Sequence, residues 1–272
     1  MNAIRGYAEL LAYKDEYEVA RLYTDGAFAK QVKAAFDGDL KFEFHLAPPL
    51  LARRDALQND APAQAEFWRG LGLQMPAADT LKVSLFAYEN DALPALFDAW
   101  ANGAHAVLCL VPEGRILPQV KAYFATENGY QKGRLTVQIV PFVAQADYDI
   151  LLWACDLNFV RGEDSCVRAQ WAGKPFVWQI YPQHDDVHQV KLQALLAVYG
   201  ANLGAAEQAA LRGVWQAWNG ENVELDWARW CAARLALTVH ARVWAAQLAQ
   251  NSLTLNLLDF CAEMGKIRAF KN

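Results

Sequence analysis

Short apolar runs alternate with helical patterns along most of this chain. Runs of strand type, rich in apolar residues, lie at 81–90 (LKVSLFAYEN), 104–114 (AHAVLCLVPEG) and 135–143 (LTVQIVPFV). The segments 91–103 and 120–129, which follow the first two runs, carry apolar residues at helical spacing. Strands that alternate with helices at this spacing predict an α/β fold with a Rossmann-like, doubly wound and mainly parallel sheet.

The clearest crossover lies between Asp149 and Pro182. DILLWA (149–154) is predicted as a buried strand, CDLNFVRG (155–162) as a loop and residues 163–172 as a helix. FVWQIY (176–181) is predicted as the next strand. The loop of this βαβ unit opens onto a helix N-terminus at the carboxyl end of a parallel strand, where α/β sheets bind ligands.

Residues of two kinds meet at this predicted helix start. Free backbone N–H groups favour an anion there, and the guanidinium of Arg161 suits a phosphate. Glu163, Asp164 and Ser165 would equally well cap the helix and complement its dipole. On the residues alone, an anion site and a capped helix both stay open.

The chain divides into three predicted regions. Residues 1–54 are expected to form a helical or α+β appendage, which is too short to bury an independent core. Composition shifts to Ala and Pro over 55–80, which predicts a helix and a linker. Residues 81–272 are expected to form the Rossmann-like domain, with helices over most of 205–270.

Composition excludes several classes of function. The net charge of −5 and a pI of about 5.6 argue against non-specific binding to nucleic acid or to an anionic membrane. No signal peptide and no run of transmembrane length occurs, so the protein is expected to be soluble and cytoplasmic. The five cysteines are far apart and form no C-x-x-C pair, so no disulfide framework or metal–thiolate site is expected.

Two cofactor-binding motifs are weak or missing. The first strand is not followed by G-x-G-x-x-G, which argues against a dinucleotide cofactor. The histidines of HDDVH (184–188) lack an evident third ligand, so capping is expected there rather than metal binding. Phe86, Tyr88 and Tyr148 lie near predicted strand ends, where they would stack on a base or pack in the core. The residues thus indicate a domain that binds a nucleotide or a nucleotide-sugar.

A resemblance to a known family sharpens this prediction. SLFAYEN (84–90), QADYD (145–149), CDLNFVRGEDSCVRAQWAGKPFVWQIYPQ (155–183) and VHQVKL (187–192) resemble the protein-arginine rhamnosyltransferases. That family modifies elongation factor P with dTDP-β-L-rhamnose as the donor. The resemblance implies a GT-B glycosyltransferase, of which this chain would carry the C-terminal, donor-binding half, with elongation factor P as its partner and without a metal or cofactor.

The resemblance also implies roles for the residues at the helix start. Arg161, Gly162, Asp164 and Ser165 would hold the diphosphate, and Glu163 would be the carboxylate required for activity. Because the guanidinium of an arginine has a pKa above about 12, the acceptor is a poor nucleophile while charged. Acidic groups would therefore orient and deprotonate one nitrogen for attack on the anomeric carbon, with inversion.

A second set of residues would bind the rest of the donor. By the same resemblance, Tyr148 and Phe86, or Tyr88 beside it, would sandwich the thymine, and Gln145 would contact the nucleotide.

The N-terminal region resembles something else. Residues 7–55 resemble the far C-terminal part of indolepyruvate ferredoxin oxidoreductases, but no cysteine precedes Cys109, so that family's iron–sulfur chemistry is not expected. Nothing in 1–54 resembles the aspartate-bearing N-terminal domain of the rhamnosyltransferases. We therefore expect donor binding with weak or absent transfer by this chain alone. The alternatives are a non-catalytic nucleotide-sugar binding remnant and a transferase for a different nucleotide-sugar.

Overall fold

The computed structural model describes residues 61–124, 129–141, 145–182, 187–221 and 223–250. The chain splits into two compact units, and nearly all described residues belong to the unit Pro49–Ala249. The predictions for 1–54 and for HDDVH up to residue 186 lie outside the described residues.

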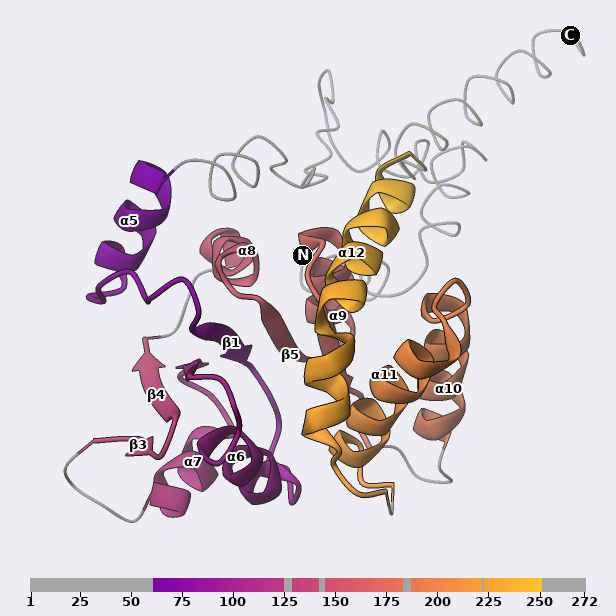
Figure 1. Cartoon of the computed structure of the whole chain (residues 1–272), viewed down its shortest axis with the longest axis horizontal. Coiled ribbons are helices and arrows are strands. Elements are labelled where there is room, and N and C mark those ends of the chain that lie inside the picture. The colour runs from indigo at the N-terminus through magenta and orange to yellow at the C-terminus, as the bar shows by residue number, and fades with distance from the viewer. Residues whose placement is uncertain (1–60, 125–128, 142–144, 183–186, 222, 251–272) are drawn as a thin grey trace, which may run out of the picture. The chain divides into compact units, whose positions relative to one another are not determined.

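The described core is a twisted sheet of mostly parallel strands (Figure 1). Its order is β3-β4-β2-β1-β5-β6, and only the short pairing of β3 with β4 is antiparallel. The strands are β1 (Leu81–Leu85), β2 (Val107–Pro112), β3 (Gln131–Lys132), β4 (Leu135–Val140), β5 (Leu157–Arg161) and β6 (Phe176–Gln179). The Rossmann-like parallel sheet is thereby confirmed, and β3 is an added edge strand that the sequence pattern did not indicate.

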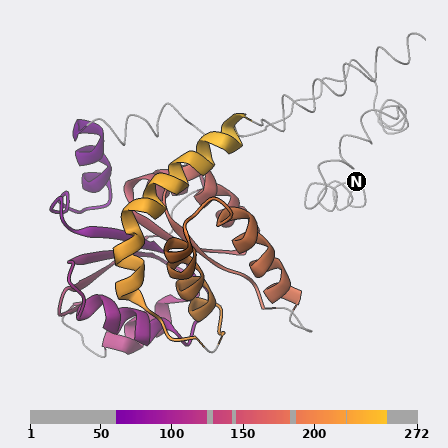
Figure 2. The same cartoon turned by 45° about the vertical axis from the view of Figure 1, so that its right-hand side comes forward.

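Helices cover both faces of the sheet. Figures 1 and 2 show α6 and α7 on one side of the strands, and α8 contacts α9 on the other. The helices are α5 (Ala61–Gly70), α6 (Leu93–Ala101), α7 (Leu117–Phe124), α8 (Gln145–Ala154), α9 (Gly162–Ala172), α10 (Val187–Tyr199), α11 (Ala205–Trp218) and α12 (Trp227–Gln250). Large aromatic side chains fill the space between these layers, and Trp100, Trp215, Trp218 and Trp230 are almost fully buried.

One predicted strand is wrong. DILLWA (149–154) lies within α8, and the strand that leads into α9 is β5, which had been predicted as part of a loop. A short apolar run suits a buried helix as well as a buried strand, and Leu151, Leu152 and Trp153 of α8 are all buried.

Asn158 explains why β5 was mistaken for a loop. Asparagine favours turns, but here it lies in a central strand and is completely buried. The Ser84 hydroxyl donates to Asn158 Oδ1 over 2.6 Å, and Asn158 Nδ2 donates to the Leu152 carbonyl over 3.0 Å. These partners satisfy the buried amide, so the polar side chain is tolerated inside the sheet.

Candidate functional site

The sheet reverses its strand order between β1 and β5. The chain moves from β1 outward to β2 and β4, then returns to place β5 on the other side of β1. Ligands bind to such sheets at the carboxyl ends of the two strands that flank the reversal. Here those ends carry Phe86 and Tyr88 after β1, and Arg161 and Gly162 at the junction of β5 with α9.

The start of α9 is open to an anion. Arg161 is the N-cap residue, with extended φ and ψ of −127° and 157°, and its side chain makes no capping hydrogen bond. Gly162 follows with a φ of +65°, a conformation that favours glycine, and its carbonyl accepts a 2.6 Å hydrogen bond from Trp178 Nε1. The first turn therefore presents backbone N–H groups beside a strongly basic side chain.

The guanidinium of Arg161 lies against two aromatic rings. Its central carbon is 4.4 Å from the centroid of Phe86 and 4.6 Å from that of Tyr88. A Cβ added to Gly162 would lie 3.4 Å from the Tyr88 hydroxyl, so Tyr88 reaches from the β1 end to the start of α9. The ion pairs seen among the described residues do not include Arg161.

The predicted residues of the first turn of α9 differ in their surroundings. Glu163 is exposed, whereas Ser165 is buried. The Asp164 carboxylate pairs at 2.9 Å with Arg168, which also contacts Asp149 at 3.0 Å. The structure thus brings Glu163, Asp164 and Ser165 together in the first turn of α9. The Asp164 carboxylate, however, is paired with Arg168.

Tyr148 lies on α8 rather than at a strand end. Its ring makes an edge-to-face contact with Phe86, with centroids 5.5 Å apart and an interplanar angle of 61°. Its hydroxyl is buried without a hydrogen-bond partner of good geometry among the described residues. Burial raises the pKa of this phenol, an effect that the nearby Ser165 hydroxyl opposes. Gln145 is the first residue of the same helix.

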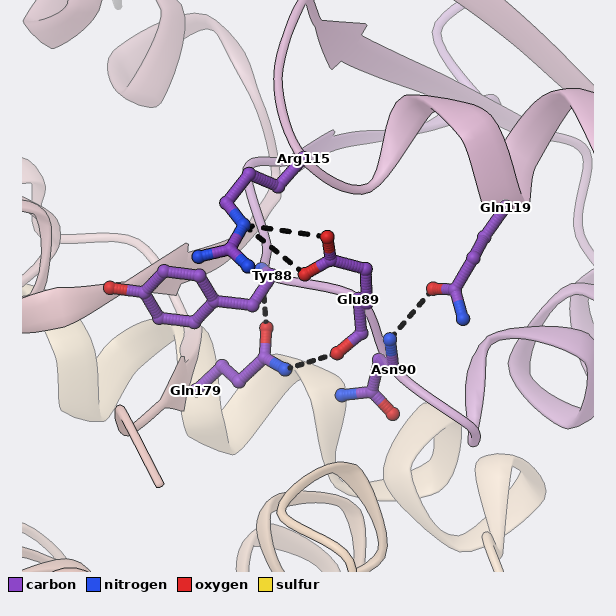
Figure 3. A network of polar contacts seen from close by, with 6 residues as sticks. All are labelled: Tyr88, Glu89, Asn90, Arg115, Gln119 and Gln179. Carbon is purple, nitrogen blue, oxygen red and sulfur yellow. Dashed lines mark hydrogen bonds and ion pairs between the residues drawn. The ribbon is translucent and has the colours of Figure 1, made fainter. Parts of the chain in front are cut away.

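A polar network that the sequence did not indicate holds the loop after β1 (Figure 3). Tyr88 N donates to Gln179 Oε1 over 2.8 Å, and Gln179 Nε2 donates to the Glu89 carbonyl over 3.2 Å. Asn90 N donates to Gln119 Oε1 over 2.7 Å. Arg115 pairs with the Glu89 carboxylate, with Nε 3.3 Å from Oε2. Gln179 lies inside the predicted strand 176–181 but is the last residue of the observed β6, so no local signal in the sequence indicated this network.

The described residues lack two further kinds of feature. They contain no group of three or more His, Cys, Asp and Glu side chains arranged to hold a metal ion. Across the same parts of the chain, no helix is both long and apolar enough to cross a membrane.

Comparison with known proteins gives several matches. Residues 44–262 match the model of the family described as Elongation-Factor P (EF-P) rhamnosyltransferase EarP. Residues 1–80 match a family of unknown function, DUF6537, so the resemblance of this region to a ferredoxin oxidoreductase stays a prediction.

The curated relatives carry one name. A protein-arginine rhamnosyltransferase of Pseudomonas putida is 45% identical over 78% of this chain and 58% of its own length. Its namesake from Pseudomonas aeruginosa is 47% identical over 62% of this chain and 46% of its own length. The chain spans about half the length of the curated relatives it matches.

A solved structure also matches. It concerns the structural basis for EarP-mediated arginine glycosylation of translation elongation factor EF-P, is 41% identical, and superposes with a TM-score of 0.70 over 84% of this chain and 75% of that chain. The observed sheet and this match agree with the predicted half of a GT-B fold. The chain therefore belongs to the EarP family of elongation factor P rhamnosyltransferases.

Proposed function

We propose that this chain binds dTDP-β-L-rhamnose and takes part in the transfer of its rhamnose to an arginine side chain of elongation factor P. The observation that carries the proposal is Arg161, which lies at the reversal of the sheet between two aromatic rings and at an uncapped helix start. The match of this segment to EarP supports the choice of donor and acceptor.

The donor diphosphate would bind at the start of α9. Arg161 supplies a guanidinium with a planar set of donors, and Gly162 allows close approach of the backbone. Asp164 would contribute its backbone N–H, because its carboxylate pairs with Arg168 and would repel a phosphate. The Ser165 hydroxyl, next to Tyr148, is a further donor in the same turn.

The nucleoside would bind to the aromatic side chains beside this turn. Phe86 and Tyr88 flank Arg161, and Tyr148 borders Phe86. Movement of the Arg161 guanidinium onto the diphosphate would free ring surface for the thymine. Gln145 at the start of α8 would contact the nucleotide.

Glu163 would act on the acceptor. Its exposed position in the first turn of α9 puts a carboxylate beside the proposed leaving group. A carboxylate there can orient the guanidinium of the acceptor and remove its proton as the anomeric carbon is attacked with inversion. The helix terminus and Arg161 would stabilise the departing diphosphate, so the step requires no metal.

Calorimetry with dTDP-rhamnose tests donor binding. We expect Arg161→Ala to weaken binding at least about tenfold, because a charge-assisted contact to the diphosphate is lost. Glu163→Gln should bind the donor nearly as well as the wild type does. No heat with the wild type, or equal affinity in the wild type and Arg161→Ala, would contradict the site. Competition with UDP- and GDP-sugars identifies the nucleotide.

A second candidate function is donor binding without transfer. It is favoured by the match of residues 1–80 to a family of unknown function, a different family model from the one that matches residues 44–262. Incubation with elongation factor P and dTDP-rhamnose, followed by intact mass measurement, separates the two functions. We expect little or no rhamnosylation by the chain alone. Full modification that Glu163→Gln abolishes would instead establish a complete enzyme.

A further inference from the structure

We propose that Arg115 is a second diphosphate-binding residue, which Glu89 holds in place until the donor binds. This inference rests on the proposed function, because the ligand is the same nucleotide diphosphate. It adds a residue from the β2–α7 loop to a site that otherwise consists of the ends of β1 and β5 and the starts of α8 and α9.

The geometry places two guanidinium groups around one ring. The central carbon of Arg115 lies 5.7 Å from the centroid of Tyr88, and that of Arg161 lies 4.6 Å from the same centroid. The hydroxyl of Tyr88 borders Gly162 at the start of α9. Figure 3 shows the Arg115 side chain extending over the Tyr88 ring. Tyr88 thus connects Arg115 to the helix terminus where the diphosphate is expected.

The charges around Tyr88 favour an anionic ligand. Arg115 and Arg161 carry two positive charges, and Glu89 is the carboxylate that pairs with Arg115. A backbone hydrogen bond, followed by the two arginines, lowers the pKa of Glu89, so this residue stays ionised at neutral pH. At the Tyr88 ring, two guanidinium groups thus face the single carboxylate of Glu89, while Glu163 adds a further carboxylate in the first turn of α9.

The ion pair between Arg115 and Glu89 is weak enough for Arg115 to exchange Glu89 for a phosphate. Both side chains are more than half exposed, at 57% and 52%, and exposed ion pairs contribute little stability. The backbone of the same loop is fixed independently, because Gln179 bonds to Tyr88 N and to the Glu89 carbonyl. Arg115 can therefore leave Glu89 for a phosphate without displacement of the loop.

A purely structural ion pair predicts a different result from a ligand-binding one. If Glu89 and Arg115 only shape the loop, their separate removal should shift ligand affinity in the same direction. If Glu89 competes with the diphosphate for Arg115, the two changes should act in opposite directions. The sign of each effect is thus the decisive readout.

Calorimetric titration with thymidine 5′-diphosphate tests the proposal. We expect Arg115→Ala to weaken binding about fivefold and Glu89→Gln to tighten it about twofold, as suits half-exposed charged contacts. Arg115→Lys should fall between the wild type and Arg115→Ala. Titration with thymidine, which has no phosphate, should be unaffected by all three changes.

Lys132→Ala is the matched control. Lys132 is also an exposed cation that pairs with a carboxylate, Asp98, at 2.7 Å, and lies 4.6 Å from the centroid of a tyrosine, Tyr123. Because these groups belong to α6, α7 and the β3 edge, we expect no change in affinity for the diphosphate.

The outcomes separate this inference from the proposed function. Unchanged affinity in Arg115→Ala, or shifts of the same sign in Arg115→Ala and Glu89→Gln, would overturn the role of Arg115 while Arg161→Ala still weakens binding. Failure of the wild type to bind the diphosphate at all would overturn both proposals.

Discussion

At the scale of single residues, the backbone conformation of Gly162 is expected to affect both stability and ligand binding. Its φ of +65° lies in the left-handed region, where a Cβ costs about 1–2 kcal/mol. The added methyl group of an alanine would also lie 3.4 Å from the Tyr88 hydroxyl. We expect Gly162→Ala to lower the free energy of unfolding in urea by about 1–2 kcal/mol and to weaken binding of thymidine diphosphate.

Gly173, at the other end of α9, is the matched control. Its φ is +66°, and an added Cβ would make only an ordinary 3.5 Å contact with Ala245. Gly173→Ala should lose similar stability and retain ligand affinity. Equal weakening of ligand binding by both variants would mean that Gly162 acts only through the general stability of α9.

At the scale of elements, the buried Gln179 side chain ties the end of β6 to the loop after β1. β5 lies between β1 and β6 but ends where α9 begins, so it offers no strand partner to the loop after β1. The Gln179 side chain supplies hydrogen bonds to that loop instead. We expect Gln179→Ala to cost about 2–3 kcal/mol in urea unfolding, since two backbone groups lose their partners. Weaker diphosphate binding should accompany this loss, because Tyr88 is no longer held.

Gln119→Ala serves as the comparison for this prediction. Gln119 makes one hydrogen bond to the same loop, at Asn90 N, so its loss should cost about 1 kcal/mol. If Gln179→Ala proves no more costly than Gln119→Ala, the bridge from β6 is not what fixes the loop.

At the scale of the whole molecule, buried thiols and phenols make the fold sensitive to alkali. Burial raises the pKa of Cys166 from 9.0 to about 12, and it also raises the pKa values of Cys109, Cys155, Tyr148 and Tyr199. Since the unfolded chain releases these protons at lower pH than the folded one, stability is retained below pH 9 and falls as the pH rises further. The lowered pKa of the largely buried Lys174 acts in the opposite direction, but it is a single group.

Urea unfolding under reducing conditions from pH 7 to pH 10.5 measures this effect. Each buried thiol should remove up to about 1.4 kcal/mol per pH unit above its ordinary pKa. Cys166→Ala should therefore have a shallower slope than the wild type above pH 9, whatever its stability at pH 7. A flat profile up to pH 10.5 would show that these groups ionise without unfolding.

The local sequence pattern alone was enough to predict most of the strands of the sheet and the helix α9. The residues of β1, β2, β4 and β6 form apolar runs of strand length, and the acidic first turn and terminal glycine of α9 mark a helix. These signals depend on neighbours in the chain, so the sequence determines them directly. The RGEDS run indicated an anion site, which stays a prediction. Together with the motifs at 84–90, 145–149 and 187–192 it also indicated the family, which the comparisons confirm.

The tertiary structure decided those features that depend on residues far apart in the chain. Asn158 is tolerated inside β5 because Ser84, 74 residues away in the chain, bonds to its side chain. The convergence of Arg115 and Arg161 on Tyr88 likewise requires strand ends that only the sheet brings together. The role of a polar or charged side chain depends on the hydrogen-bond and charge partners that surround it after folding. Sequence spacing does not specify those partners.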